Sequence, residues 1–410
     1  MPETRRFGTI MKILSFAALG AYLLLCTREY LAMRFAAQAT DASLSRAARL
    51  EPGSAEIWTH IGRRQLFAQG EAPKAAESFQ HSLALDPYDS STWLDLAAAQ
   101  ELSGNADHAH AAMLRAVAVD RTTPSVHWRA ATYFLAHGDE ASALSEVRIA
   151  AEHSKALIPD AIHVVWNITR TPDAVLDSVP HTEFAYHQVL WYFVLAQEPD
   201  AAGVAWQRLQ QLGGAVDVEA MSAYAELLIT AKRIDKASEV WTGYCTGRSQ
   251  TSYCEERNAL RNGSFEEPVL GRGFDWHLYD SPGVQTAVDF STAYEGSRSL
   301  RLDYSDDAKA DSGFFQLVPL RPNSVYRLSG FYKPDGLAAL HPPQLVLDDP
   351  RTQRVLATSP ELSGSAGWQS FSATFDSGDV PLARLHMLHL PVEGPIHGTV
   401  WLDAVRLELQ

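Results

Sequence analysis

The stretch NGSFEEPVLGRGFDW, from Asn262 to Trp276, divides the chain into two parts. Before it, apolar residues recur at the spacing of helices. After it, apolar and polar residues alternate as they do in strands. The stretch itself joins an Asn-Gly turn signal to a glycine-rich turn that leads into Trp276. The sequence therefore predicts a multidomain α + β protein, with an α-solenoid followed by a β-sandwich.

Length and charge limit the classes of function. A chain of 410 residues is long enough for two or three domains. It carries 34 basic and 49 acidic residues, a formal net charge of −15. Such a chain repels phosphate backbones, so we expect no nucleic-acid partner.

The N-terminus predicts a membrane segment. Arg5, Arg6 and Lys12 precede the apolar run Ile13–Cys26, and extension back through Phe7–Met11 brings the run close to the length of a membrane span. A cleaved signal peptide and an uncleaved anchor both fit this pattern. We favour the anchor, because no small-x-small cleavage site follows and the helical pattern continues. The basic residues predict a cytoplasmic N-terminus and an exported remainder.

The three cysteines leave two alternatives open. Cys245 and Cys254 lie nine positions apart, on either side of a turn rich in glycine, serine and threonine. In an oxidising compartment they could form a disulfide, and otherwise they are two separate thiols. Cys26 lies in the apolar N-terminal run.

Four columns of residues recur every 34 positions and indicate helical hairpins. They are Gly70, Gly104 and Gly138; Ala75, Ala109 and Ala143; Phe79, Met113 and Val147; and Ser82, Ala116 and Ala150. Glycine suits the left-handed end of the first helix of each pair. Alanine lets the two helices approach closely, and the larger apolar residues fill the space between them. The columns predict hairpins at about 54–87, 88–121 and 122–155.

With Trp58, Trp93 and Pro87, these columns resemble the tetratricopeptide repeat. Two departures stand out: the first unit has one extra residue before Gly70, and Arg121 replaces the closing proline of the second unit. The resemblance implies a right-handed solenoid whose concave face binds a protein partner. This expectation rests on fold analogy.

The repeats continue in a less regular form. Asp200–Leu209 and Asp235–Tyr244 align at a spacing of 35 residues, and each follows an apolar helix. We expect three further irregular helix pairs within residues 156–250. The tryptophans that recur at helical spacing in this part of the chain are expected to be core residues.

The last third predicts about eight to ten short strands, which fit a jelly-roll sandwich. The predicted domains are accordingly an anchor at 1–30, tetratricopeptide-like repeats at 31–155, degenerate repeats at 156–261 and the sandwich at 262–410.

Four segments of the last third occur in the order of a known family. They are NGSFEEP, AYEGSRSLRLDYS, FQLVPLRPNSVYRLSGFYK and GTVWLDAVRLEL. Together they resemble carbohydrate-binding modules of families four, nine and twenty-two, over nearly all of residues 262–410. The pairing of such a module with an anchored repeat array also resembles proteins found beside bacterial exopolysaccharide genes. The resemblance implies a protein of the bacterial inner membrane whose bulk lies in the periplasm.

The resemblance to these modules implies a structural calcium ion. The candidate ligands carried over are the carboxylates of Glu266 and Asp403, with backbone oxygens from Glu295 and Gly296. Calcium takes about six or more oxygen ligands, which separated strands can supply. The alternative is that Glu266 caps a turn and that Asp403 faces solvent.

Sugar rings stack on exposed aromatic side chains, and neighbouring polar groups then bind their hydroxyls. The candidate carbohydrate-binding residues are Trp276, Tyr279, Phe315, Tyr332 and Trp368. Strand alternation turns about half of such residues inward, and Trp276 could equally be a packing residue.

The chain contains no recognised catalytic motif, so we predict a non-catalytic protein. The leading hypothesis is a membrane-anchored periplasmic scaffold. Its solenoid would bind a protein and its jelly roll a polysaccharide, in exopolysaccharide synthesis or export. A purely structural interaction protein and a glycan-active enzyme are the alternatives.

Overall fold

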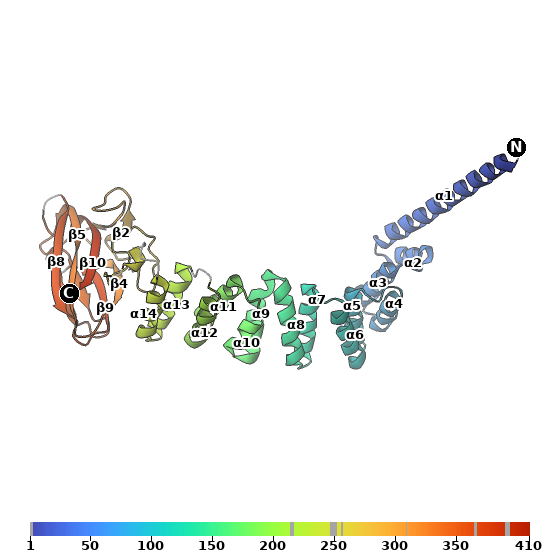
Figure 1. Cartoon of the computed structure of the whole chain (residues 1–410), viewed down its shortest axis with the longest axis horizontal. Coiled ribbons are helices and arrows are strands. Elements are labelled where there is room, and N and C mark those ends of the chain that lie inside the picture. The colour runs from blue at the N-terminus through green and yellow to red at the C-terminus, as the bar shows by residue number, and fades with distance from the viewer. Residues whose placement is uncertain are drawn as a thin grey trace. The chain divides into compact units, whose positions relative to one another are not determined.

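The computed structural model describes residues 3–213, 217–246, 252–255, 257–308, 310–364, 367–389 and 394–410, with side chains from residue 14 onward. The chain forms two compact units, Met1–His181 and Thr182–Gln410. In the described residues, fourteen α-helices precede ten strands in two antiparallel sheets (Figure 1). The predicted order of a helical part and a strand part is confirmed.

The first helix, α1 (Glu3–Ala36), contains an apolar stretch at Leu14–Ala36. By length and composition this is the one described helix that could cross a membrane, and a signal sequence passes the same test. Its side chains are mostly exposed, but Ala32 and Ala36 pack against α2 (Asp41–Leu50). Anchor and signal peptide both remain predictions.

Helix pairs make up the rest of the first unit. They are α3 (Ala55–Arg63), continued by the π-helix η1 (Arg64–Ala68), with α4 (Ala72–Leu85); α5 (Ser90–Leu102) with α6 (Ala106–Val119); α7 (Pro124–Ala136) with α8 (Glu140–His153); and, after the 3-10 turn η2 (Lys155–Leu157), α9 (Ile158–Thr169) with α10 (Pro172–Asp177).

The repeated columns have the roles that the sequence predicts. Gly70, Gly104 and Gly138 all have left-handed backbone, with φ of +69°, +78° and +75°. The alanine column is fully buried, and the two columns after it are also buried. A second repeated contact joins the units, because the indole N–H of Trp58 donates to the carbonyl of Pro52 and that of Trp93 to the carbonyl of Pro87.

The extra residue of the first unit lies in a π-helical turn. The η1 segment widens the helix between α3 and Gly70, and such turns accommodate single-residue insertions in α-helices. The column at Gly70 therefore keeps its register with the later units, although Trp58 and Trp93 are one residue further apart than the glycines.

The second unit begins with two helix pairs. They are α11 (Glu183–Leu195) with α12 (Pro199–Gln211) and α13 (Val218–Thr230) with α14 (Ile234–Cys245). Trp206 and Trp241 are buried, as expected of core residues, whereas Trp191 is half-buried. After α14, Cys245 forms a disulfide with Cys254, in the 3-10 turn η3 (Ser252–Cys254).

The sandwich consists of two five-stranded antiparallel sheets. One has the order β1 (Trp276–Leu278), β4 (Asp311–Pro319), β9 (Leu382–Leu388), β6 (Gln344–Asp348) and β7 (Val355–Thr358). The other has the order β2 (Val284–Asp289), β3 (Ser299–Tyr304), β10 (His397–Leu409), β5 (Val325–Ala338) and β8 (Gln369–Asp376). A continuous apolar core separates them.

The opening stretch forms a tight loop on this core. The side-chain amide of Asn262 donates to the carbonyl of Glu267 at 2.9 Å, and its oxygen accepts the Glu267 N–H at 3.1 Å. Phe265 is fully buried and stacks on Trp276. The Trp276 indole N–H donates to the Asn262 carbonyl at 2.9 Å. Trp276 is therefore a packing residue.

The helix pair α13–α14 contacts the loop before β1. The Gly273 N–H donates to the Glu226 carboxylate at 2.7 Å, and Trp241 lies edge-on to Phe274. A Cβ at Gly273 would lie 2.8 Å from the Trp241 ring, so glycine is required for this approach.

Substitution of Gly62 tests the close packing of the first hairpin. A Cβ at this position would lie 2.5 Å from the Phe79 ring. We expect Gly62→Ala to lower the free energy of unfolding of α3 and α4 by about 1–3 kcal/mol, because the buried ring has to shift. Hydrogen exchange of peptides spanning residues 55–85 measures the loss in the full-length protein. Gly53→Ala is the control, since a Cβ there meets nothing closer than 4.0 Å. Equal exchange in both variants would contradict this packing.

Asp275 makes stability depend on pH. Its carboxyl is fully buried, one oxygen accepts the Leu270 N–H, and the other has no partner in the described chain. Burial raises the pKa of Asp275 to about 7.

The proton therefore binds more tightly in the folded chain than in the unfolded one. The stability from this group is full below the ordinary aspartate pKa and falls as the pH rises toward about 7, by a few kcal/mol. We expect Asp275→Asn to flatten the thermal-stability profile between pH 4 and pH 7, whereas the exposed Asp280→Asn leaves it unchanged. An unchanged slope in Asp275→Asn would disprove this origin of the pH dependence.

Candidate functional site

The outer face of the sheet β1-β4-β9-β6-β7 carries aromatic and polar side chains in adjacent rows. His277, Phe315, His386 and Val346 are paired across neighbouring strands, and so are Leu317, Arg384 and Asp348. Their sequence neighbours Phe314, Leu385 and Leu347 lie in the core. Because strand side chains alternate, both rows face away from the core.

One part of this face is aromatic. The rings of His277 and Phe315 stack with centroids 4.4 Å apart, and Tyr279 lies 6.0 Å from Phe315. Tyr279 is 42% exposed and Phe315 is half-buried. We call these three residues the aromatic strip.

A chain of polar groups lies beside the aromatic strip. The Tyr279 hydroxyl donates to Asp311, whose other oxygen lies 3.4 Å from His386 Nδ1. His386 Nε2 lies 3.4 Å from Asp348, which accepts two hydrogen bonds from the Arg384 guanidinium at 3.1 and 2.7 Å. Asp311, His386, Asp348 and Arg384 are called the polar chain below.

The electrostatics of the polar chain lower the pKa of Asp311. Burial would raise the pKa of Asp311, but hydrogen bonds from His386, Tyr279 and the Gly313 N–H hold it below its ordinary value. The bond to Asp348 raises the pKa of Arg384. His386 and Asp348 are buried, whereas Asp311 and Arg384 are half-buried. The accessible acceptor and donor beside the rings are therefore Asp311 and Arg384, which suit a ligand with hydroxyl groups.

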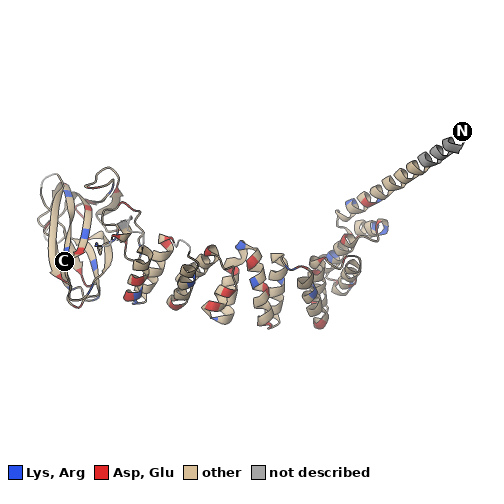
Figure 2. Cartoon of the chain, viewed as in Figure 1, with Lys and Arg blue, Asp and Glu red and all other residues tan. Residues whose placement is uncertain are grey.

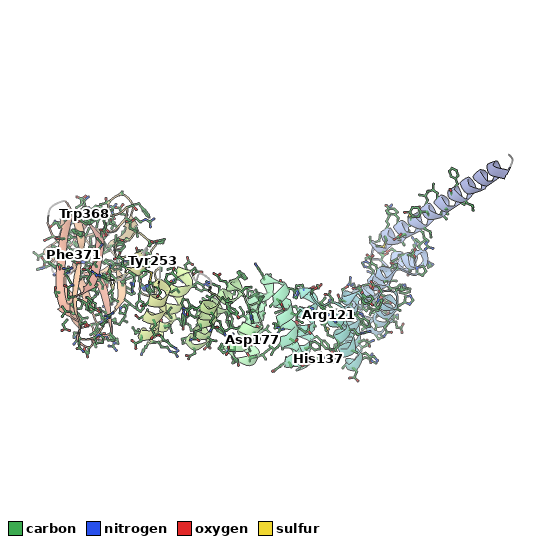
Figure 3. All side chains as sticks on the ribbon, in the orientation of Figure 1. Arg121, His137, Asp177, Tyr253, Trp368 and Phe371 are labelled. Carbon is green, nitrogen blue, oxygen red and sulfur yellow. A yellow bond between two sulfur atoms is a disulfide. The ribbon has the colours of Figure 1, made fainter. Side chains whose placement is uncertain are left out.

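Two of the five predicted sugar contacts lie in the aromatic strip, and three do not. Tyr279 and Phe315 lie there together. Trp276 and Tyr332 are buried in the core, so neither ring has a free face for a sugar. Trp368 lies just before β8 in the other sheet, edge-on to Tyr294 (Figure 3). The predictions for Trp276 and Tyr332 therefore need correction.

The sequence reasoning missed His277 and the whole polar chain. Two histidines lie three positions apart at the end of β9, His386 and His389. His386 does lie on the outer face, while His389 packs edge-on against the core residue Tyr304. The only sequence signal is that His386 alternates with the apolar residues Leu385 and Met387, while its neighbours Asp311 and Asp348 follow from the strand order of the structure.

Glu266 accepts hydrogen bonds from a loop of the second sheet. One carboxylate oxygen accepts the N–H groups of Ser297 at 2.7 Å and Arg298 at 2.9 Å, and the other accepts the Ser297 hydroxyl at 2.9 Å. The Arg298 guanidinium donates to the Glu266 carbonyl at 2.7 Å. A Cβ at Gly296 would lie 2.3 Å from the same carboxylate. Glu266 thus has the geometry of a turn cap.

Asp403 accepts N–H groups from the same loop. It is fully buried and accepts the N–H groups of Tyr294 at 2.7 Å, Glu295 at 3.1 Å and Ala404 at 2.6 Å. Burial raises the pKa of Asp403 to about 6, although these N–H groups favour the charged form. The Glu295 side chain lies 3.4 Å from Arg406.

These donors do not fit the calcium shell that the family resemblance implies. Calcium requires oxygen ligands, but N–H groups surround both carboxylates, and a guanidinium binds the carbonyl of Glu266. Among the described residues, no three His, Cys, Asp or Glu side chains gather where they could hold a metal ion. Calcium at this place stays a prediction from the resemblance.

Comparison with known proteins gives partial likenesses. No protein-family model matches the chain. The tRNA nuclease WapA of Bacillus subtilis (strain 168) is 30% identical over 164 residues, which cover 37% of this chain and 7% of the nuclease. The chain thus spans a small fraction of that relative.

Solved structures that resemble parts of the chain include a CBM4 domain and the protein MamA. The CBM4 domain is 17% identical, covers 37% of this chain and 99% of its own, and has a TM-score of 0.29. MamA is 14% identical, covers 42% of this chain and 84% of its own, and has a TM-score of 0.25.

Removal of divalent ions tests the loop around Glu266. We expect the thermal unfolding midpoint of the full-length protein to be the same in excess chelator and in millimolar calcium, because N–H groups already satisfy both carboxylates. Differential scanning calorimetry in detergent measures it. Glu266→Ala should lower the midpoint in both buffers, since it leaves the N–H groups of Ser297 and Arg298 unpaired. A calcium-dependent rise of several degrees would show that the loop rearranges around an ion.

Proposed function

We propose that this protein is a non-catalytic, membrane-anchored periplasmic scaffold of exopolysaccharide synthesis or export. Its sandwich binds polysaccharide on the aromatic strip, and its helical repeats bind a protein partner. The observation that carries the proposal is the aromatic strip, with Tyr279 and Phe315 accessible beside the polar chain. Pyranose rings present apolar faces to such rings and hydroxyls to the neighbouring polar groups.

Charge favours a neutral polysaccharide as the ligand. The chain has a net charge of −15, and acidic and basic residues are interspersed over both sheets and helices (Figure 2). A polyanionic glycan would be repelled at long range. Within the polar chain, Arg384 is already paired with Asp348, so it adds no free positive charge for an anionic sugar.

The protein-binding part of the proposal has support in one shared face of the repeats. Asp95 on α5 is buried and contacts Arg63 on α3 at 2.6 Å and Arg129 on α7 at 3.5 Å. Both arginines remain partly exposed. The first helices of three successive pairs therefore present side chains on one continuous surface.

The geometry of the polar chain supports binding over catalysis. Glycoside hydrolysis needs one carboxyl group that is protonated near neutral pH. Asp311 is held below its ordinary pKa, and Asp348 is paired with Arg384. The family resemblance supports the exopolysaccharide role, and α1 supports an anchor.

Truncation of Phe315 tests the proposed site. We expect Phe315→Ala to weaken retention of the full-length protein by neutral polysaccharides about tenfold, because the stacking surface is lost. Affinity electrophoresis in gels that contain each polysaccharide measures the change. The control is Tyr88→Ala, an exposed aromatic residue of the repeats.

Other outcomes decide between the alternatives. If the wild-type protein is retained by no neutral or acidic polysaccharide, the purely structural alternative gains support. Release of reducing ends during the assay would favour a glycan-active enzyme.

A further inference from the structure

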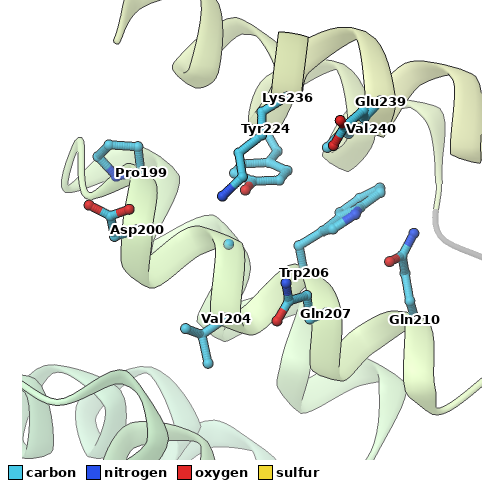
Figure 4. A pocket seen from close by; sticks show the side chains of 11 residues that line it. Pro199, Asp200, Val204, Trp206, Gln207, Gln210, Tyr224, Lys236, Glu239 and Val240 are labelled. Carbon is cyan, nitrogen blue, oxygen red and sulfur yellow. The ribbon is translucent and has the colours of Figure 1, made fainter. Parts of the chain in front are cut away.

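A pocket of about 310 Å³ lies between α12 and α14, with Tyr224 of α13 in its lining (Figure 4). This volume is at the lower end of small-molecule sites. Trp206, Gln207 and Gln210 line it from α12, and Lys236 and Glu239 from α14. Nothing in the proposed function uses this pocket.

Two polar groups in this pocket make no hydrogen bond within the described chain. Tyr224 is 3% exposed and Trp206 is 5% exposed, and their ring centroids are 5.5 Å apart. In the described part of the chain, neither the Tyr224 hydroxyl nor the Trp206 indole N–H makes a hydrogen bond. A Cβ at Gly203, another lining residue, would lie 3.0 Å from the Tyr224 hydroxyl, so glycine leaves this group accessible.

Three other buried indoles of the described chain donate within the protein. The N–H groups of Trp241, Trp276 and Trp401 donate to Tyr253, Asn262 and Asp289. Neither the Tyr224 hydroxyl nor the Trp206 indole N–H is among the fully buried atoms that lack a partner in the described chain, so both groups remain accessible to a ligand in the pocket.

A groove between α4 and α6 provides an internal comparison. It has a volume of about 420 Å³, and its aromatic residue is Trp93. The Trp93 indole N–H already donates to Pro87, and the groove walls are mainly Leu83, Leu96 and alanines. A groove thus lies between the second helices of neighbouring pairs at both places. The α12–α14 pocket differs from the α4–α6 groove because two of its lining groups, on Tyr224 and Trp206, make no hydrogen bond in the described chain.

The charges around the pocket cancel. Asp200 makes two hydrogen bonds with Arg233 at 2.5 and 3.0 Å, and Lys236 and Glu239 carry opposite charges. A ligand of either net charge gains little from this arrangement. Hydrogen-bonding side chains line several sides of the pocket. A single peptide unit could bind few of them, because it offers one donor and one acceptor. A small ring with several hydroxyls could bind more of them.

We propose that this pocket binds one ring of a neutral saccharide. The Tyr224 hydroxyl and the Trp206 indole N–H donate to ring or hydroxyl oxygens, and the amides of Gln207 and Gln210 bind further hydroxyls. The inference rests on the proposed function for the class of ligand, but it concerns a different site from the aromatic strip.

The test uses the full-length protein in detergent and four neutral monosaccharides: glucose, galactose, mannose and N-acetylglucosamine. Saturation-transfer NMR detects binding and calorimetry gives the dissociation constant. We expect Tyr224→Phe to weaken binding of at least one sugar about fivefold, because it removes one hydrogen bond and leaves the ring. Gln210→Ala should weaken the same sugar. Tyr88→Phe, which changes an exposed residue of the first unit, should leave its affinity unchanged.

The outcomes separate this inference from the proposed function. If no monosaccharide binds, or if Tyr224→Phe binds all of them as the wild type does, the pocket proposal is wrong, while polysaccharide retention that depends on Phe315 would leave the proposed function standing. Loss of monosaccharide binding in Tyr224→Phe but not in Phe315→Ala supports the pocket as an independent site. Binding of N-acetylalanine amide in place of the sugars, lost in Tyr224→Phe, would overturn the saccharide class.

Discussion

The backbone contact between the segment before β1 and the last strand, β10, holds the sandwich together. The Val405 N–H donates to the Gly263 carbonyl at 2.9 Å, and the Ala259 N–H donates to the Leu407 carbonyl at 2.8 Å. The approach is so close that a Cβ at Gly263 would lie 2.0 Å from the Val405 oxygen. Asn258 reinforces it by accepting the Leu407 N–H at 2.9 Å.

The same segment also binds the other sheet. The side-chain amide of Gln316 on β4 accepts the Arg261 N–H and donates to the Arg261 carbonyl, at 2.9 and 2.8 Å. One short segment thus joins both sheets and places Phe265 and Trp276 between them. This arrangement explains why the sequence pattern changes from helical to strand-like spacing at Asn262. The residues after Asn262 complete the core of the sandwich, to which the helices do not contribute.

How far the sequence predicted each part depends on how local its determinants are. The hairpin columns were predictable, because a left-handed glycine and a small residue at a helix contact act within one unit. The π-helical turn at η1 was not, since an extra residue can be absorbed in a helix or in a loop at similar cost. The face of the sheet on which each aromatic side chain lies depends on the register of the strands. Alternation indicated that Phe314 and Phe315 point to opposite sides, but only the pairing with β9 decided which one faces outward.

The polar chain needed tertiary information for the same reason. Asp311 and His386 are 75 residues apart and become neighbours only because β4 and β9 pair. Glu266 and Asp403, whose carboxylates the resemblance assigns to calcium, both accept N–H groups from residues 294–298. The family pattern identifies acidic residues but does not predict which N–H groups hydrogen-bond to them. These N–H groups determine the chemistry of the loop.

The helix α13 carries residues that contact both proposed binding surfaces of the second unit. Tyr224 and Glu226 are two positions apart, so they project from different sides of the helix. Tyr224 lines the α12–α14 pocket, while Glu226 accepts the Gly273 N–H and lies 3.9 Å from His277 of the aromatic strip. The two proposed surfaces therefore share a structural element. Coupling between them would require that α13 has two arrangements, which the two ligands favour to different extents.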